Sequence, residues 1–174
     1  MKGNFLKRRL LLSFLFWFSA IAVTITHSEI KEPTFEQYRV AEQFVGKPAP
    51  VDLKSAPGAS RFRTGLRYGA KKGPNFAGHY TIVEWGCGTG CDNIAVIDAA
   101  NGRVVFPEEL NPLFFPGLPV GKIPEGMVYK KESSLFIVHG VPSTKKKVGS
   151  YYFLWKKGRF VLIFSHEWGT ASKN

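Results

Sequence analysis

The sequence lacks most of the patterns that mark an enzyme. No two carboxylates stand at a recognisable catalytic spacing, so glycosidase chemistry has no candidate residues. The glycines beside Cys87 and Cys91 are not followed by a Lys-Ser pair, which argues against a nucleotide-binding loop. His166 and Glu167 lack the spacing of a metalloprotease helix. The sequence therefore favours a protein without enzymatic activity, and we expect no catalytic residue, no bound metal and no cofactor.

Acidic residues are also scarce. The chain has 24 Lys and Arg against 13 Asp and Glu, a net charge of +11. Four of the basic residues and none of the acidic ones lie in residues 1–28, so the remainder keeps a net charge of +7. This balance favours anionic partners such as phospholipid headgroups, cell-wall polymers or acidic proteins. A well-charged surface with no dedicated partner is the alternative.

Residues 1–28 are predicted to be a signal peptide. Basic residues precede an apolar run over residues 10–25, which is short for a membrane span of about 20 residues and typical of a signal sequence. An uncleaved anchor at the inner membrane, formed by residues 10–26, is the alternative. In both cases residues 29–174 are predicted to form a single periplasmic or secreted domain, and we expect no nucleic acid partner.

The only two cysteines, Cys87 and Cys91, lie in a glycine-rich loop. In an exported chain an even number of cysteines favours a disulfide, and we expect it to tie the tip of a β-hairpin used in recognition. Three alternatives remain: a reactive thiol with His79 as its base, a copper or zinc site built from the CxxxC motif and a histidine, and an anion nest of glycine amides. Thioredoxin-like copper-assembly proteins share the spacing, but this chain lacks their βαβ pattern.

The hydrophobic pattern predicts an α+β fold. Apolar stripes at helical spacing predict helices over residues 33–45 and 60–72, the second capped by Ser60. Alternating runs and short turns predict an antiparallel, curved sheet of about six or seven short strands with these two N-terminal helices packed on it. The strand candidates are residues 79–85, 93–98, 103–106, 127–129, 135–139, 151–155 and 159–166, and residues 107–126 and 141–150 are predicted to be long loops.

The second predicted helix is strongly basic. It carries Arg61, Arg63, Arg67, Lys71 and Lys72, which make a candidate surface for an anion or a membrane. A solvated outer face needs no partner and is the alternative reading. Gly65 and Gly69 weaken this helix but permit a close approach by another part of the chain.

Residues 62–106 resemble the signature of a family of exported proteobacterial proteins of unknown function. The shared features are an F-R-T-x-L-R helix, the phrase G-P-N-F-A-G-H-Y, and W-G-C-G-x-x-C followed by a short strand and an Asn-Gly turn. The resemblance covers about a quarter of the chain and brings no activity with it. It implies that Asn75, His79, Tyr80, Trp85 and the cysteine loop act as a unit.

The predicted binding residues combine that unit with one more position on the first strand. They are Asn75, His79, Tyr80, Glu84, Trp85, Cys87 and Cys91. We expect a non-enzymatic envelope protein that binds another macromolecule or an anionic envelope component. The alternatives are a thiol- or metal-dependent envelope protein centred on His79, Glu84 and the two cysteines, and a structural role at the membrane surface through the basic helix.

Overall fold

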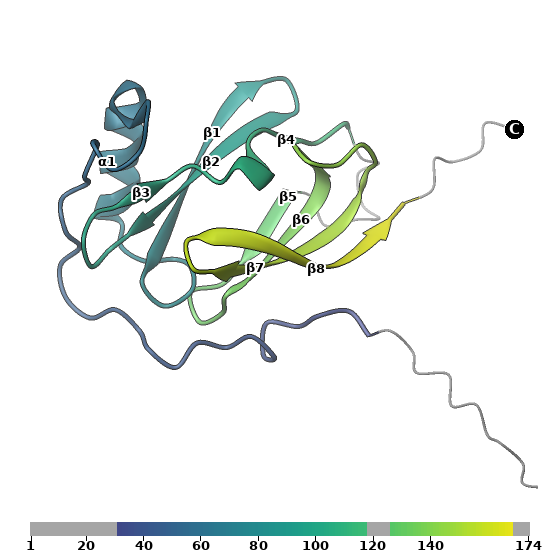
Figure 1. Cartoon of the computed structure of the whole chain (residues 1–174), viewed down its shortest axis with the longest axis horizontal. Helices are drawn as coiled ribbons and strands as arrows, with labels where there is room; N and C mark the ends of the chain where they lie inside the picture. The colour runs from purple at the N-terminus through teal and green to yellow at the C-terminus, as the bar shows by residue number, and fades with distance from the viewer. Residues whose placement is uncertain (1–30, 118–125, 169–174) are drawn as a thin grey trace, which may run out of the picture. The chain divides into compact units, whose positions relative to one another are not determined.

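The computed structural model describes residues 31–117 and 126–168, and the described residues from Glu32 onward belong to one compact unit. Figure 1 shows a helix and a set of strands that follow one another along the chain. The helical elements are η1 (Ala59–Phe62), α1 (Arg63–Lys71) and η2 (Glu108–Leu110). The strands are β1 (Tyr80–Gly88), β2 (Cys91–Asp98), β3 (Val104–Val105), β4 (Leu113–Phe114), β5 (Gly126–Tyr129), β6 (Leu135–Pro142), β7 (Gly149–Lys156) and β8 (Arg159–Glu167).

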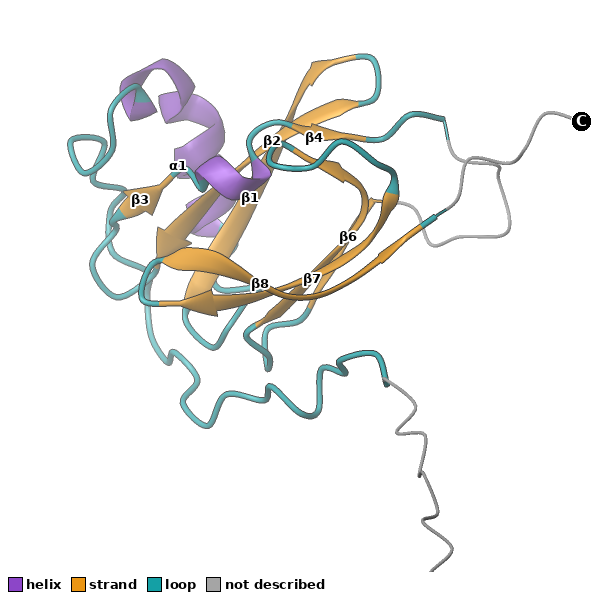
Figure 2. Ribbon diagram, turned by 45° about the vertical axis from the view of Figure 1, so that its right-hand side comes forward, coloured by secondary structure: helices purple, strands orange, loops and turns teal. Residues whose placement is uncertain are grey.

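The eight strands form one open antiparallel sheet in the order β1-β2-β4-β6-β7-β8 (Figure 2). The short strand β3 also pairs with β2, and β5 also pairs with β6. The prediction of an α+β fold with an antiparallel sheet is confirmed. The strand number is slightly higher than expected, because β4 lies inside the connection that was predicted to be a loop.

Strand β4 joins the β1–β2 hairpin to the β5–β8 meander. Its two residues pair with Cys91 and Asp92 of β2 on one side and with Val141 and Pro142 of β6 on the other. Leu113 is fully buried between them, whereas Phe114 is exposed. A two-residue strand beside prolines has no period of its own, so the sequence pattern could not reveal it.

The helix predicted over residues 33–45 is wrong. This segment makes one turn and then runs extended past the strand ends, where Val40 N donates to Glu132 O (2.9 Å) and Phe44 N donates to Gly78 O (3.0 Å). The backbone N–H groups of this segment thus bond to carbonyls of distant loops, whereas in a helix they would bond to carbonyls of the same segment. Of the predicted stripe, Phe35 and Tyr38 pack on the core, but Val45 is 90% exposed.

The basic helix is present and covers one face of the β1–β2 hairpin. It comprises η1 and α1, and neither element has a side-chain cap, so the predicted capping by Ser60 is wrong. Leu66 and Ala70 are buried against Val83 and its neighbours on the sheet. The helix therefore packs through the face that its apolar spacing predicted, and its basic residues stay exposed.

The hairpin is buried on both faces. Ile82, Ile94 and Val96 point into a core shared with β6, β7 and β8. Val83, Ala95 and Ile97 point the other way, into the cluster beneath α1. A strand covered on both faces reads as a continuous apolar run, which is what residues 94–97 show.

The two helical glycines give a direct test of this packing. A Cβ at position 69 would lie 2.5 Å from Val83 Cγ2, whereas one at position 65 would meet nothing within 4 Å. Since Val83 is a stiff, buried side chain, we expect Gly69→Ala to destabilise the protein by about 1–3 kcal/mol. Gly65→Ala should instead stabilise it by up to about 1 kcal/mol, because alanine favours the helix.

Urea denaturation of the full chain measures both variants. Opposite shifts of the unfolding midpoint are the expected result. Equal shifts would show that α1 does not sit against Val83 as described.

Candidate functional site

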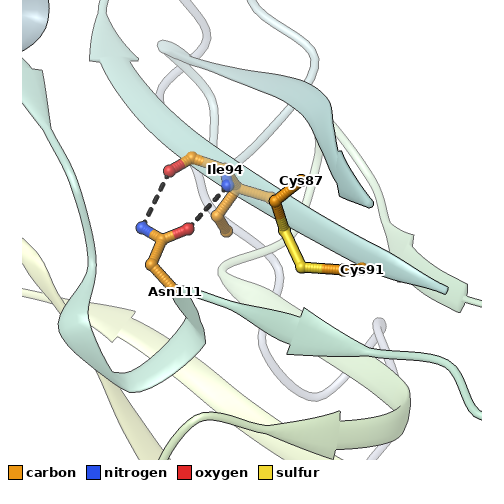
Figure 3. The surroundings of a disulfide bond; sticks show 4 residues. All are labelled: Cys87, Cys91, Ile94 and Asn111. Atoms are coloured by element: carbon orange, nitrogen blue, oxygen red, sulfur yellow. Dashed lines mark hydrogen bonds between the residues drawn. A yellow bond between two sulfur atoms is a disulfide. The ribbon is translucent and has the colours of Figure 1, made fainter. Parts of the chain in front are cut away.

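The cysteine loop closes the far end of the β1–β2 hairpin. Cys87 and Cys91 form a disulfide with their Cα atoms 5.1 Å apart, which confirms the predicted pairing (Figure 3). The loop is exposed from Gly86 to Gly90, so the tip projects into solvent. Gly90 has a φ of 63° and accepts a hydrogen bond from Phe115 N at 2.7 Å. The tip is therefore fixed at its base by the chain that follows β4.

Asn75 is occupied by the fold. Its Nδ2 donates to Ile82 O (3.2 Å), and its Oδ1 accepts from Ile82 N (2.7 Å). The side chain thus imitates a neighbouring strand along the free edge of β1. Asn111 bonds to Ile94 of β2 in the same way: its Nδ2 donates to Ile94 O (2.9 Å), and its Oδ1 accepts from Ile94 N (2.7 Å) (Figure 3). Both asparagines satisfy backbone groups that the sheet leaves unpaired.

The phrase that contains Asn75 builds a turn and part of the core. Ala77 and Gly78 adopt left-handed φ values of 42° and 81°, and Tyr80 N donates to Phe76 O at 2.9 Å. Phe76 is fully buried, with its ring 5.8 Å from the rings of both Phe136 and Phe160. The phrase formed by residues 73–80 of the signature therefore has a structural explanation, because these residues build the turn and contribute Phe76 to the core.

His79 and Tyr80 lie at the opposite end of β1 from the disulfide. Cys87 follows His79 by eight positions, about 26 Å along a strand at about 3.3 Å per residue. His79 is partly exposed, packs on the Tyr80 ring, and has its Nε2 3.9 Å from Asp98 Oδ1. The structure therefore does not bring the histidine to the sulfurs, and the seven predicted residues do not form one cleft.

Glu84 and Trp85 take opposite faces of β1. Glu84 Oε1 accepts a 2.6 Å hydrogen bond from the Tyr129 hydroxyl; burial, followed by this bond, raises the pKa of Tyr129 well above its usual range. Trp85 lies on the face that α1 covers, where its ring is 4.7 Å from Phe62 and 6.0 Å from Phe106. Glu84 is itself exposed, on the face of β1 that α1 does not cover.

The basic residues of η1 and α1 are all exposed. Arg63, Arg67 and Lys71 follow one another at i, i+4 and i+8 and so form one stripe along the helix. The structure gives them no ion pair with any carboxylate of residues 31–117 or 126–168. Two aromatic side chains share this surface: Phe62 is 40% exposed and Tyr68 is 66% exposed.

A groove runs beside the helix. It has a volume of about 670 Å³ and lies between α1 and the segment 47–51, whose Ala49 N donates to Ala99 O at 2.8 Å. Its cationic lining residues are Lys47, Arg67 and Lys71, its other lining residues are apolar, and no carboxylate lines it. Sequence reasoning missed Lys47, since only the tertiary fold brings that loop to the helix.

No protein-family model, curated protein or solved structure matches this chain. The family resemblance of residues 62–106 therefore stays a prediction. Within the described parts of the chain, no helix is long and apolar enough to cross a membrane. The same residues contain no group of three His, Cys, Asp or Glu side chains placed to hold a metal ion. The predicted signal peptide or anchor lies outside the described residues.

The role of Asn75 can be tested by its removal. Asn75→Ala leaves a backbone donor and acceptor of β1 without their partners, so we expect a loss of about 1–3 kcal/mol in the free energy of unfolding. Asn93 is the matched control, since its half-buried side chain makes no hydrogen bond to a described residue. Asn93→Ala should change stability by less than about 0.5 kcal/mol.

Urea denaturation of the two full-length variants compares them. A stability loss at Asn93 equal to that at Asn75 would contradict the strand-mimicking role.

Proposed function

We propose that this protein is a non-enzymatic, exported envelope protein that binds an anionic envelope component, and that an anionic phospholipid fits its surface best. Export is supported by the predicted signal sequence and by the disulfide, which suits an oxidising compartment. The groove beside α1 is the observation that carries the proposal. Three cations border an apolar floor there, and no carboxylate lines it.

The chemistry of the groove suits an amphiphile. Arg67 offers a planar fork that bonds two phosphate oxygens at once, and Lys47 and Lys71 add point charges. The apolar residues between them include Pro48, Val51 and Ala70, and these accept the first methylene groups of an acyl chain. A soluble anion would use the charges and leave this apolar surface in water.

The exposed aromatics extend the same surface. Phe62 and Tyr68 lie on η1 and α1 among the basic residues, and aromatic rings with cations are typical of segments that lie in a membrane interface. Lys72 Nζ also stands 4.7 Å from the centre of the Tyr68 ring. Trp85 contacts Phe62, so we propose that the disulfide-tied hairpin is the second part of this recognition surface.

Two short-chain lipids test the proposal. The full chain, kept in a neutral detergent, is titrated with dihexanoyl phosphatidylglycerol and with dihexanoyl phosphatidylcholine, and binding is followed by calorimetry. We expect the anionic lipid to bind at least tenfold more tightly. The double variant Arg67→Gln with Lys71→Gln should lose at least tenfold in affinity for it, because each cation near an anionic surface contributes about 1 kcal/mol.

The control removes the same charge elsewhere. Lys145 and Lys146 lie in the turn between β6 and β7, outside the groove. Their double substitution by Gln should leave the affinity unchanged within about twofold, since distant surface charges are screened. Equal binding of the two lipids, or equal losses in both double variants, would overturn the proposal.

A further inference from the structure

A second cavity lies beside the β2–β3 turn, on the face of the hairpin opposite the basic helix. It has a volume of about 340 Å³, within the range of small-molecule sites. Its apolar lining comes from Tyr80, Val96, Val105 and Trp155, so β1, β2, β3 and β7 all contribute. The edge of the Tyr80 ring meets the Trp155 ring, with centroids 5.3 Å apart. This cavity places Tyr80, a predicted binding residue, against a core tryptophan.

The wall formed by the β2–β3 turn is built in advance. Asp98 Oδ1 accepts from Ala100 N (2.8 Å), and Asp98 Oδ2 accepts from Asn101 Nδ2 (3.0 Å). Gly102 packs so closely on Pro50 O that no Cβ fits there, and its own carbonyl accepts from Asp52 N at 2.8 Å. The turn is therefore held from both sides and does not need a ligand to order it.

The charges of the cavity favour an anion. Arg103 and Lys157 line it and form no ion pair with a carboxylate in the described ranges. Asp98 is the single carboxylate of the lining, and each of its oxygens already accepts a hydrogen bond within the turn. The lining thus has two cations and one carboxylate that accepts hydrogen bonds from its own turn, and the cavity keeps a net positive charge.

Lys157 occupies a costly backbone position. It has a φ of 53° and is followed by Gly158 with a φ of 77°, the pair of left-handed residues that a two-residue type I′ turn requires. Asn-Gly is the preferred sequence for such a turn, and a left-handed lysine is uncommon. The fold of the turn therefore does not explain the lysine, whereas a charge held over the cavity does.

Trp155 adds one further observation. Its Nε1 is buried and has no hydrogen-bond partner in the described part of the molecule. An indole N–H is a donor only, so its missing partner is an acceptor. Since this nitrogen is not exposed at the cavity surface, its N–H reports on the packing of the cavity wall without contacting the anionic group of a ligand.

We infer that this cavity is a binding site for a small organic anion, a carboxylate or phosphate joined to a compact apolar body. Arg103 and Lys157 hold the anionic group at the rim, since the guanidinium fork and the ammonium both donate to oxyanions. The apolar body rests on the rings of Tyr80 and Trp155. The site is independent of the proposed lipid surface, because the two share no lining residue.

Three probes test the inference on the full chain in a neutral detergent. Benzoate and phenyl phosphate supply the two anionic groups, and benzyl alcohol is the neutral control. The readout is the NMR signal of the Trp155 indole N–H, assigned by its loss in Trp155→Phe. We expect one or both anions to shift this signal with a dissociation constant below about 10 mM, at least tenfold tighter than benzyl alcohol. The tighter anion identifies the preferred group.

The variants separate binding from folding. Arg103→Gln should weaken anion binding at least tenfold. Lys157→Asn should weaken it similarly while leaving the melting temperature unchanged or higher, because asparagine suits the turn better. Lys156→Gln is the control: it removes the same charge one residue away and outside the cavity, and should keep the affinity within about twofold.

Either of two results would overturn the inference. One is the absence of any shift of the Trp155 signal by both anions below about 10 mM. The other is anion binding that survives in both Arg103→Gln and Lys157→Asn. Neither result bears on lipid binding by the groove beside α1, which is measured with other ligands and other variants.

Discussion

The β1–β2 hairpin must be covered on both of its faces, and the other elements of the described fold are arranged to do so. Ile82 and Ile94 face the aromatic core of the meander, while Val83 and Ala95 face α1. The meander reaches its place through β4, which pairs with both β2 and β6. Both proposed sites lie where this covering ends: the groove at the flank of α1 and the cavity beside the β2–β3 turn.

Much of this arrangement could be predicted from local sequence. The alternation of the strands, the Asn101-Gly102 turn, the disulfide and the basic helix all depend on residues close together in the chain. The extended path of residues 33–45 could not be predicted, since its hydrogen bonds go to Glu132 and Gly78. Tertiary pairing outweighed a modest helical propensity there.

The β8 strand shows a second feature that could not be predicted from the sequence. The register with β7 shifts between Tyr152 and Phe153, so that Leu162 faces the central core and Phe164 faces the cluster that contains Phe35. One extra residue, Ile163, reverses the alternation. The sequence reads as an unbroken alternating strand, because a bulge leaves no mark in a hydrophobic pattern.

The predicted site residues divide in the same way. Asn75 was selected for its place in the signature, and it stabilises the edge of β1. Tyr80 and Trp85 belong to two different surfaces at opposite ends of one strand. No sequence pattern marked three further residues of these surfaces as binding residues, since each meets its surface only through residues distant in sequence. They are Lys47, Lys157 and Trp155. Local motifs identified the strand that organises the fold, but only the fold separates the two surfaces.

The cations of the two surfaces act in different ways. At α1 the cations are long, exposed side chains on a helix, where charge acts over a distance and is weakened by salt. At the cavity the two cations flank a hydrogen-bonded turn and two aromatic rings, where position matters more than number. A left-handed Lys157 is difficult to explain by solubility, which any exposed lysine supplies. The left-handed conformation of Lys157 disfavours a lysine, so the presence of a lysine there supports a role for its charge at the cavity.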